Sequence, residues 1–227
     1  MNLKNKIKGL LYKYRHGAIL SYFIIYMIWF TYLEQNVKEY ALVYSKLDDL
    51  IPFVEIFIIP YILWFAFIFL TVAYFFFKSK SDFYRICAFL FIGMTICLSI
   101  YSIWPNGQDL RVDLNSLGRS NIFTSILSKI YMVDTPTNVF PSIHVYNSIG
   151  AMIAIRKSES LRNIKWVQWS TAILTILISL STVFLKQHSI LDGLGAIVLS
   201  ILMYAAVYLP NWSKADKPVE QEKLSNI

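Results

Sequence analysis

The chain has 227 residues, of which 56% are hydrophobic and only 15% are charged, and its formal net charge is +7. So little polar surface excludes a water-soluble globule of this size and favours a protein that the bilayer solvates. The positive charge does not indicate nucleic-acid binding, because the basic residues form short clusters beside apolar segments, where they meet lipid headgroups. We therefore expect the membrane as a partner, and no nucleic acid.

Three apolar segments in the first half are long enough to cross a bilayer, which takes about 20 residues. A basic amphipathic stretch leads into the first of them, which we interpret as a retained span rather than a cleaved signal. Cys87 and Cys97 lie ten residues apart in the third segment, too far apart along a helix for a disulfide. The expected spans cover roughly residues 18–33, 51–77 and 86–104.

The second half begins with the longest loop, residues 105–140, which contains an amphipathic piece over residues 121–131. A loop of this length is usually functional or disordered, and its apolar content favours the first. Three further spans are expected over residues 142–155, 166–185 and 190–209. The fold class is thus all-α, a polytopic membrane bundle of about six transmembrane helices. Residues 1–210 form one domain, followed by a polar cytoplasmic tail over residues 211–227.

The basic residues predict the orientation of this bundle. In a six-span arrangement the N-terminus and residues 78–85, 156–165 and 214–217 fall on one side. That side is cytoplasmic by the positive-inside rule, and both termini lie there. The loop over residues 105–140 and the tight turn over residues 186–189 then meet on the external face.

The sequence FPSIHV begins the fourth expected span, with Pro141 suited to a first helical turn and Ser142 and His144 beside it. The N-terminus of a helix presents free N–H groups and partial positive charge, and so suits a phosphate. The alternative is that Pro141 only starts the helix and His144 packs in the bundle.

His188 and Asp192 stand four residues apart at the start of the last span, and therefore share a helical face. A carboxylate at this spacing can bind one imidazole nitrogen and leave the other free to attack or to accept a proton. The alternative makes Ser189 an N-cap, Asp192 a first-turn acid and His188 an interfacial residue.

Lys186, Arg111 and Arg119 are expected on the same face as the two histidines. Two histidines, a carboxylate and several cations suit phosphoryl transfer, which needs an attacking group, an acid and charge neutralisation. They suit zinc poorly, since a catalytic zinc normally has three protein ligands and Lys186 would oppose a dication. We expect no metal and no cofactor.

Four other polar residues have plainer interpretations. We expect His16 to be interfacial, and Asp48 and Asp49 to act as caps or loop residues. Glu55 lies near a membrane boundary, where it could pair with a loop cation.

Over roughly residues 111–192 the chain resembles the type 2 phosphatidic acid phosphatase (PAP2) superfamily of membrane lipid phosphatases and phosphotransferases. FPSIHV resembles the family's Pro-Ser-Gly-His motif. Ser181 and Thr182, followed by His188 and Asp192, keep the spacing of its Ser-Arg, His and Asp motif. Arg111 resembles the arginine of the family's first motif.

The resemblance implies a role for each matching residue. His188 would be the nucleophile that forms a phosphohistidine, Asp192 would orient it, and His144 would protonate the leaving group and then activate water. Ser142 and Arg111 would hold phosphate oxygens.

The chain also departs from the family pattern at four positions. Val112 stands where the family has proline, Trp104 where it has lysine, Ile143 where it has glycine and Thr182 where it has arginine. Lys186 could supply the charge missing at residue 182. The variant resembles most the inositol phosphorylceramide synthase-like branch, which includes transferases.

The expected function is a metal-independent membrane lipid phosphatase, a phosphoric ester or diphosphate hydrolase. It would act on a lipid phosphomonoester or isoprenyl diphosphate through a phosphohistidine. A lipid phosphotransferase, a proton-linked transporter and a non-catalytic scaffold are the alternatives. The short chain, rich in Lys, Ile and Asn, suggests a bacterial plasma membrane with the active site outside. The oligomeric state and the lipid stay open.

Overall fold

The computed structural model describes residue 9 and residues 12–210, so the expected tail and most of the basic N-terminal stretch lie outside the described residues. The described chain is an all-α bundle with one two-residue parallel strand pair. Its helices are η1 (Arg15–Ser21), α2 (Tyr22–Asn36), η2 (Lys46–Leu50), η3 (Glu55–Phe57), α3 (Ile58–Lys78), α4 (Lys80–Ile103), α5 (Ile122–Val133), α6 (Ile143–Lys157), α7 (Lys165–Phe184) and α8 (Ile190–Tyr208), and its strands are β1 (Ala41–Leu42) and β2 (Asn106–Gly107).

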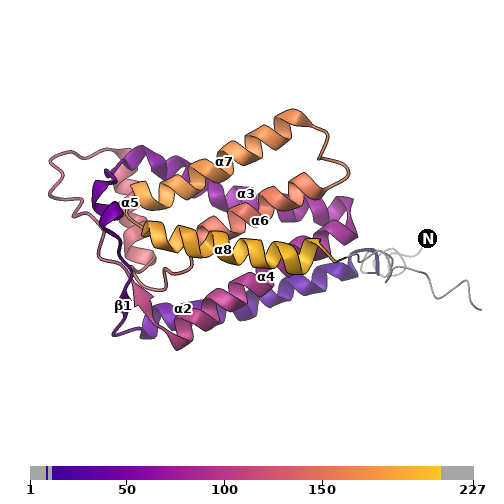
Figure 1. Cartoon of the computed structure of the whole chain (residues 1–227), viewed down its shortest axis with the longest axis horizontal. Helices are drawn as coiled ribbons and strands as arrows, with labels where there is room; N and C mark the ends of the chain where they lie inside the picture. Colours follow the sequence, from indigo (N-terminus) through magenta and orange to yellow (C-terminus); the bar gives the residue numbers. More distant parts are fainter. Residues whose placement is uncertain (1–8, 10–11, 211–227) are drawn as a thin grey trace, which may run out of the picture.

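Six helices alternate in direction along the bundle, namely α2, α3, α4, α6, α7 and α8 (Figure 1). Within the described residues, five helical segments are long and apolar enough to cross a membrane, and they contain α2, α3, α4, α7 and α8. The remaining expected span, the fourth in chain order, is the shorter α6, whose 15 residues extend only about 22 Å. This helix packs against α3, α4, α7 and α8, so the expected architecture holds with a short, central α6.

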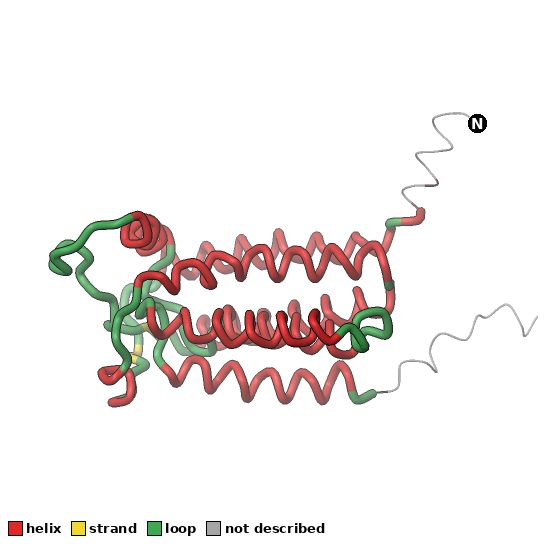
Figure 2. Tube along the Cα trace, turned by 90° about the horizontal axis from the view of Figure 1, so that it is seen from above, coloured by secondary structure: helices red, strands yellow, loops and turns green. Residues whose placement is uncertain are grey.

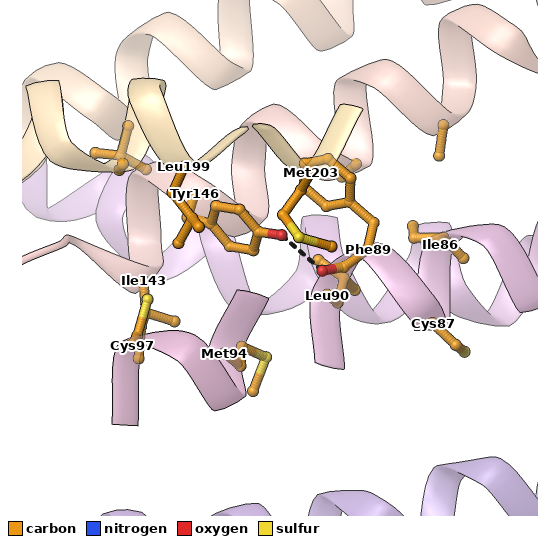
Figure 3. Packing of buried hydrophobic residues seen from close by; sticks show 14 of the residues in the cluster. Ile86, Cys87, Phe89, Leu90, Met94, Cys97, Ile143, Tyr146, Leu199 and Met203 are labelled. Atoms are coloured by element: carbon orange, nitrogen blue, oxygen red, sulfur yellow. Dashed lines mark hydrogen bonds between the residues drawn. The ribbon is translucent and has the colours of Figure 1, made fainter. Parts of the chain in front are cut away.

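The core lies mainly between α4 and α6 (Figure 3). The Tyr146 ring stacks on Phe89 with centroids 4.9 Å apart, and its hydroxyl donates to the Phe89 carbonyl at 2.6 Å. Gly93 permits this approach, because a Cβ there would lie 2.0 Å from the Tyr146 hydroxyl. By contrast, Phe69 on α3 and Ile201 on α8 are 71% and 63% exposed. Such an apolar outer surface is what lipid contact requires.

The long connections gather at one end of the bundle, here called the loop end (Figure 2). Helix α5, expected as an amphipathic piece and confirmed, lies there across the direction of the long helices (Figure 1). The buried Asn106 anchors the segment before α6, accepting the Val139 and Phe140 N–H groups on its Oδ1 at 3.0 and 2.7 Å. Glu34 at the end of α2 holds the same segment through the Asn138 amide at 2.7 Å. The expected long loop is therefore ordered and fixes where α6 begins.

The opposite end of the bundle contains His16, which the sequence analysis expected to be interfacial. Its side chain is buried within the protein, with 4% exposed. Its Nε2 donates to the Phe76 carbonyl at 3.0 Å, and its ring packs on those of Phe76 and Phe83. The residue joins the first helical segment to α3 and α4, because apolar rings on those helices enclose it.

Candidate active site

His188 lies in the tight turn between α7 and α8. Lys186 adopts a left-handed backbone conformation with φ of 55°. This geometry is typical of a helix C-terminal cap, and it lets the N–H groups of Gln187 and His188 donate to the Thr182 carbonyl at 2.9 and 3.0 Å. The turn thereby places His188 immediately before Ser189, the N-cap of α8.

Asp192 binds the His188 ring and the helix terminus at once. Its Oδ2 accepts from His188 Nδ1 at 3.0 Å and from the Ser189 N–H at 2.9 Å, and Asp192 is fully buried. The sequence left two roles open for Asp192, orienting His188 or capping the helix, and the same carboxylate performs both. A proton held on Nδ1 leaves Nε2 of a neutral imidazole as the free nucleophilic atom.

His144 faces the same turn from the first turn of α6. Its ring centroid lies 5.7 Å from that of His188, 4.8 Å from Tyr61 and 4.5 Å from Trp64. The Ser142 N–H donates to the Asp192 carbonyl at 3.1 Å and so ties the start of α6 to the first turn of α8. The structure thus brings the two histidines together at two adjoining helix N-termini.

Pro141 and Ser142 differ from the expectation in detail. Helix α6 begins at Ile143, so Pro141 precedes the helix instead of occupying its first turn. Ser142 is the N-cap, fully buried, with its hydroxyl oxygen accepting from the Val145 N–H at 3.5 Å. Cap geometry places the helix start after both Pro141 and Ser142, a detail that sequence patterns seldom resolve.

Arg111 reaches the histidine turn from the long loop. Its Nη2 donates to Gln187 Oε1 at 2.6 Å and its Nη1 to the Tyr131 carbonyl at 3.0 Å, while the guanidinium lies 4.5 Å from the Tyr131 ring centroid. Burial lowers the pKa of Arg111 from its usual value, with nearby Asp134 opposing that shift. The group remains a cation at neutral pH.

The other two expected cations are bound elsewhere. Lys186 is 9% exposed and its Nζ donates to the Asp48 carbonyl at 2.7 Å. Arg119 forms an ion pair with Glu55 at 2.7 Å, and its side chain is 54% exposed. The loop cation expected for Glu55 is therefore Arg119, and among the described residues neither Lys186 nor Arg119 forms a hydrogen bond or ion pair with a histidine.

Asp48 supports the histidine turn from the connector between α2 and α3. It is 1% exposed, and its carboxylate accepts from Ser189 Oγ at 2.6 Å and from the Ile190 N–H at 2.8 Å. It also caps η2 through the Ser45 N–H at 2.8 Å. The expected role as a cap is confirmed, and it extends to the N-terminus of α8.

A second carboxylate lies beside the site. Asp134 accepts from the Tyr61 hydroxyl at 3.2 Å, and the Tyr61 ring packs on His144. Burial raises the pKa of Asp134, while the charges of Arg111 and His188 and the Tyr61 hydrogen bond act in the opposite direction. The carboxyl is therefore easier to protonate than an exposed one.

The sequence analysis missed Tyr61, Asp134 and Gln187 as neighbours of the histidines. Gln187 had a local signal, its position directly before His188, whereas Tyr61 and Asp134 reach the site only through packing. Among the described residues, no group of three or more His, Cys, Asp or Glu side chains is placed to hold a metal ion.

Comparison with known proteins identifies a family. Residues 114–215 match the model of the PAP2 superfamily. No curated protein and no solved structure matches the chain significantly. The match covers His144, His188 and Asp192 but does not distinguish branches, so the inositol phosphorylceramide synthase-like branch stays a prediction. The chain is therefore an integral membrane protein in which residues 114–215 are similar to the PAP2 superfamily, and this similarity indicates phosphatase- or phosphotransferase-type activity.

Proposed function

We propose that the protein is a lipid phosphatase that cleaves a phosphomonoester or diphosphate through a phosphohistidine on His188. The observation that carries the proposal is the His188 and Asp192 pair at 3.0 Å, with the His144 ring 5.7 Å from His188. It supplies an oriented nucleophile and a second imidazole on the facing helix.

The proposed reaction uses these groups in two steps. His188 Nε2 attacks phosphorus while the bond to the leaving oxygen breaks, and His144, in its protonated form, gives that oxygen a proton. Neutral His144 then takes a proton from water, whose oxygen attacks the phosphohistidine and releases phosphate. Buried Asp192 favours the imidazolium that His188 becomes when Nε2 bears the phosphoryl group.

Access from the external leaflet is part of the proposal, and it is supported by the basic segments at the opposite end, including Arg156 and Lys157 in the last turn of α6. A phosphotransferase would share the first step and differ in using an alcohol in place of water.

The test is release of phosphate from lipid phosphates and isoprenyl diphosphates by purified protein in detergent with EDTA. His188→Ala should lose at least about 1,000-fold of the activity. His16→Asn is the matched control, because His16 lies buried at the opposite end. Activity in His188→Ala equal to wild type would refute the proposal. Product formed only after an alcohol is added would identify a transferase instead.

A further inference from the structure

Two buried hydrogen-bond donors beside His188 lack acceptors. Arg111 Nε and Gln187 Nε2 are both enclosed and have no partner among the described residues. Buried polar groups are nearly always satisfied, so an unpaired donor needs a specific explanation. Because Arg111 and Gln187 contact each other, their two unpaired donors indicate one bound ligand whose oxygens accept from both.

The two side chains hold each other in place. Arg111 Nη2 donates to Gln187 Oε1 at 2.6 Å, which commits the amide oxygen and leaves Nε2 as the group to be satisfied. The Gln187 backbone is fixed by its bond to the Thr182 carbonyl, and Arg111 by the Tyr131 carbonyl. Gln187 is 3% exposed, so it is a built part of the turn rather than a surface side chain.

Lys186 and Arg119, the other two cations expected to bind phosphate, are held by other partners. Lys186 Nζ is bound to the Asp48 carbonyl, and Arg119 is paired with Glu55. The residue at the family's arginine position, Thr182, donates its hydroxyl to the Ser179 carbonyl at 2.8 Å. A phosphate next to His188 must therefore find its donors elsewhere.

We propose that Gln187 is a phosphate-binding residue, and that its Nε2 and Arg111 Nε donate to oxygens of the phosphate that His188 attacks. The inference rests on the proposed function and deepens it, because a neutral amide takes over the donor that the family's arginine would provide. Arg111 supplies the charge, and Gln187 supplies direction.

The test measures inorganic phosphate binding by its effect on the apparent melting temperature of the purified full chain, without turnover. Gln187→Leu keeps the volume and removes the donors, and it should weaken phosphate binding by roughly tenfold or more. Gln187→Glu keeps an acceptor for Arg111 but opposes an anion, so it should weaken binding further. Gln168→Leu, at the opposite end of α7, should bind phosphate as the wild type does.

The Gln187→Glu variant tests whether Gln187 binds phosphate directly or only holds Arg111 in position. If Gln187 only held Arg111 in place, Gln187→Glu would preserve phosphate binding, and that result would overturn the inference. Wild-type affinity in Gln187→Leu, or no phosphate binding by the wild type, would overturn it as well. Phosphate binding that depends on Gln187 in a protein that turns over no lipid would instead overturn the proposed function and leave this site standing.

Discussion

The two ends of the bundle each bury a histidine, and the partners of the two histidines differ. At the opposite end, His16 donates to a backbone carbonyl among phenylalanine rings, and its Nδ1 is buried without a partner in the described chain. At the loop end, His188 donates to a carboxylate and faces a second histidine. Burial alone therefore does not distinguish a packed histidine from a reactive one. What distinguishes the reactive histidine is a carboxylate that fixes its tautomer and a second titratable ring nearby.

The carboxylate beside His188 is the main difference from His16, and its removal should have the largest effect. Asp192→Asn should lower kcat by about 100- to 10,000-fold, because an amide that donates to Nδ1 puts the imidazole proton on Nε2. Lipid phosphate hydrolysis measures the loss, and an unchanged elution profile confirms the fold. Near-normal kcat would mean that Asp192 serves only as the helix cap.

A second difference is that the loop end is held by a buried acid from a distant segment. Asp48→Asn should lower stability by about 1–3 kcal/mol, since an amide cannot accept from all three of its donors, Ser45, Ser189 and Ile190. We also expect kcat to fall more than KM changes, because the His188 turn loses its support. Asp49→Asn is the matched control, an exposed neighbour that should change stability by no more than about 0.5 kcal/mol. Equal effects of the two variants would contradict this role of Asp48.

The raised pKa of Asp134 predicts how pH acts on the loop end. Because burial favours the protonated form, the folded chain binds more protons than the unfolded chain above pH 3.8, the ordinary value. The free energy of unfolding should then fall as pH rises through this window. Asp134→Asn should remove that dependence and be more stable than the wild type near neutrality, because its amide oxygen still accepts from Tyr61.

The measurement for Asp134 is thermal unfolding across a pH series, followed with a thiol dye that reacts with the buried Cys87 and Cys97 on exposure. Parallel pH profiles for the wild type and Asp134→Asn would rule out this contribution. The charges that oppose the shift are those of Arg111 and His188, so the series is best repeated with His188→Ala.

The smallest effect is expected where the loop end is exposed. Arg119→Ala removes an ion pair with Glu55 in which the arginine is 54% exposed, and should change stability by no more than about 1 kcal/mol. Hydrolysis should stay within about twofold of wild type. A tenfold loss of activity, absent from Glu55→Gln, would restore the phosphate role that the sequence suggested for Arg119.

Local chemistry was readable from the sequence. Apolar runs predicted the long helices. The mixture of apolar and polar residues over α5 predicted an amphipathic segment, which the structure confirms. The contact between His188 and Asp192 was also predictable, because residues four apart on a helix meet whatever the rest of the chain does.

Contacts between distant segments needed the tertiary structure. The approach of His144 to His188 joins two helices, and the bond from Asp48 to Ser189 joins segments 141 residues apart. The sequence likewise placed Lys186 at the phosphate, whereas packing turned its ammonium to a carbonyl. Periodicity and capping act within a few residues, so the helices and the His188 motif could be predicted from the sequence alone. Which side chains meet there was decided only by how the helices and the long loop pack, because each partner comes from a different part of the chain.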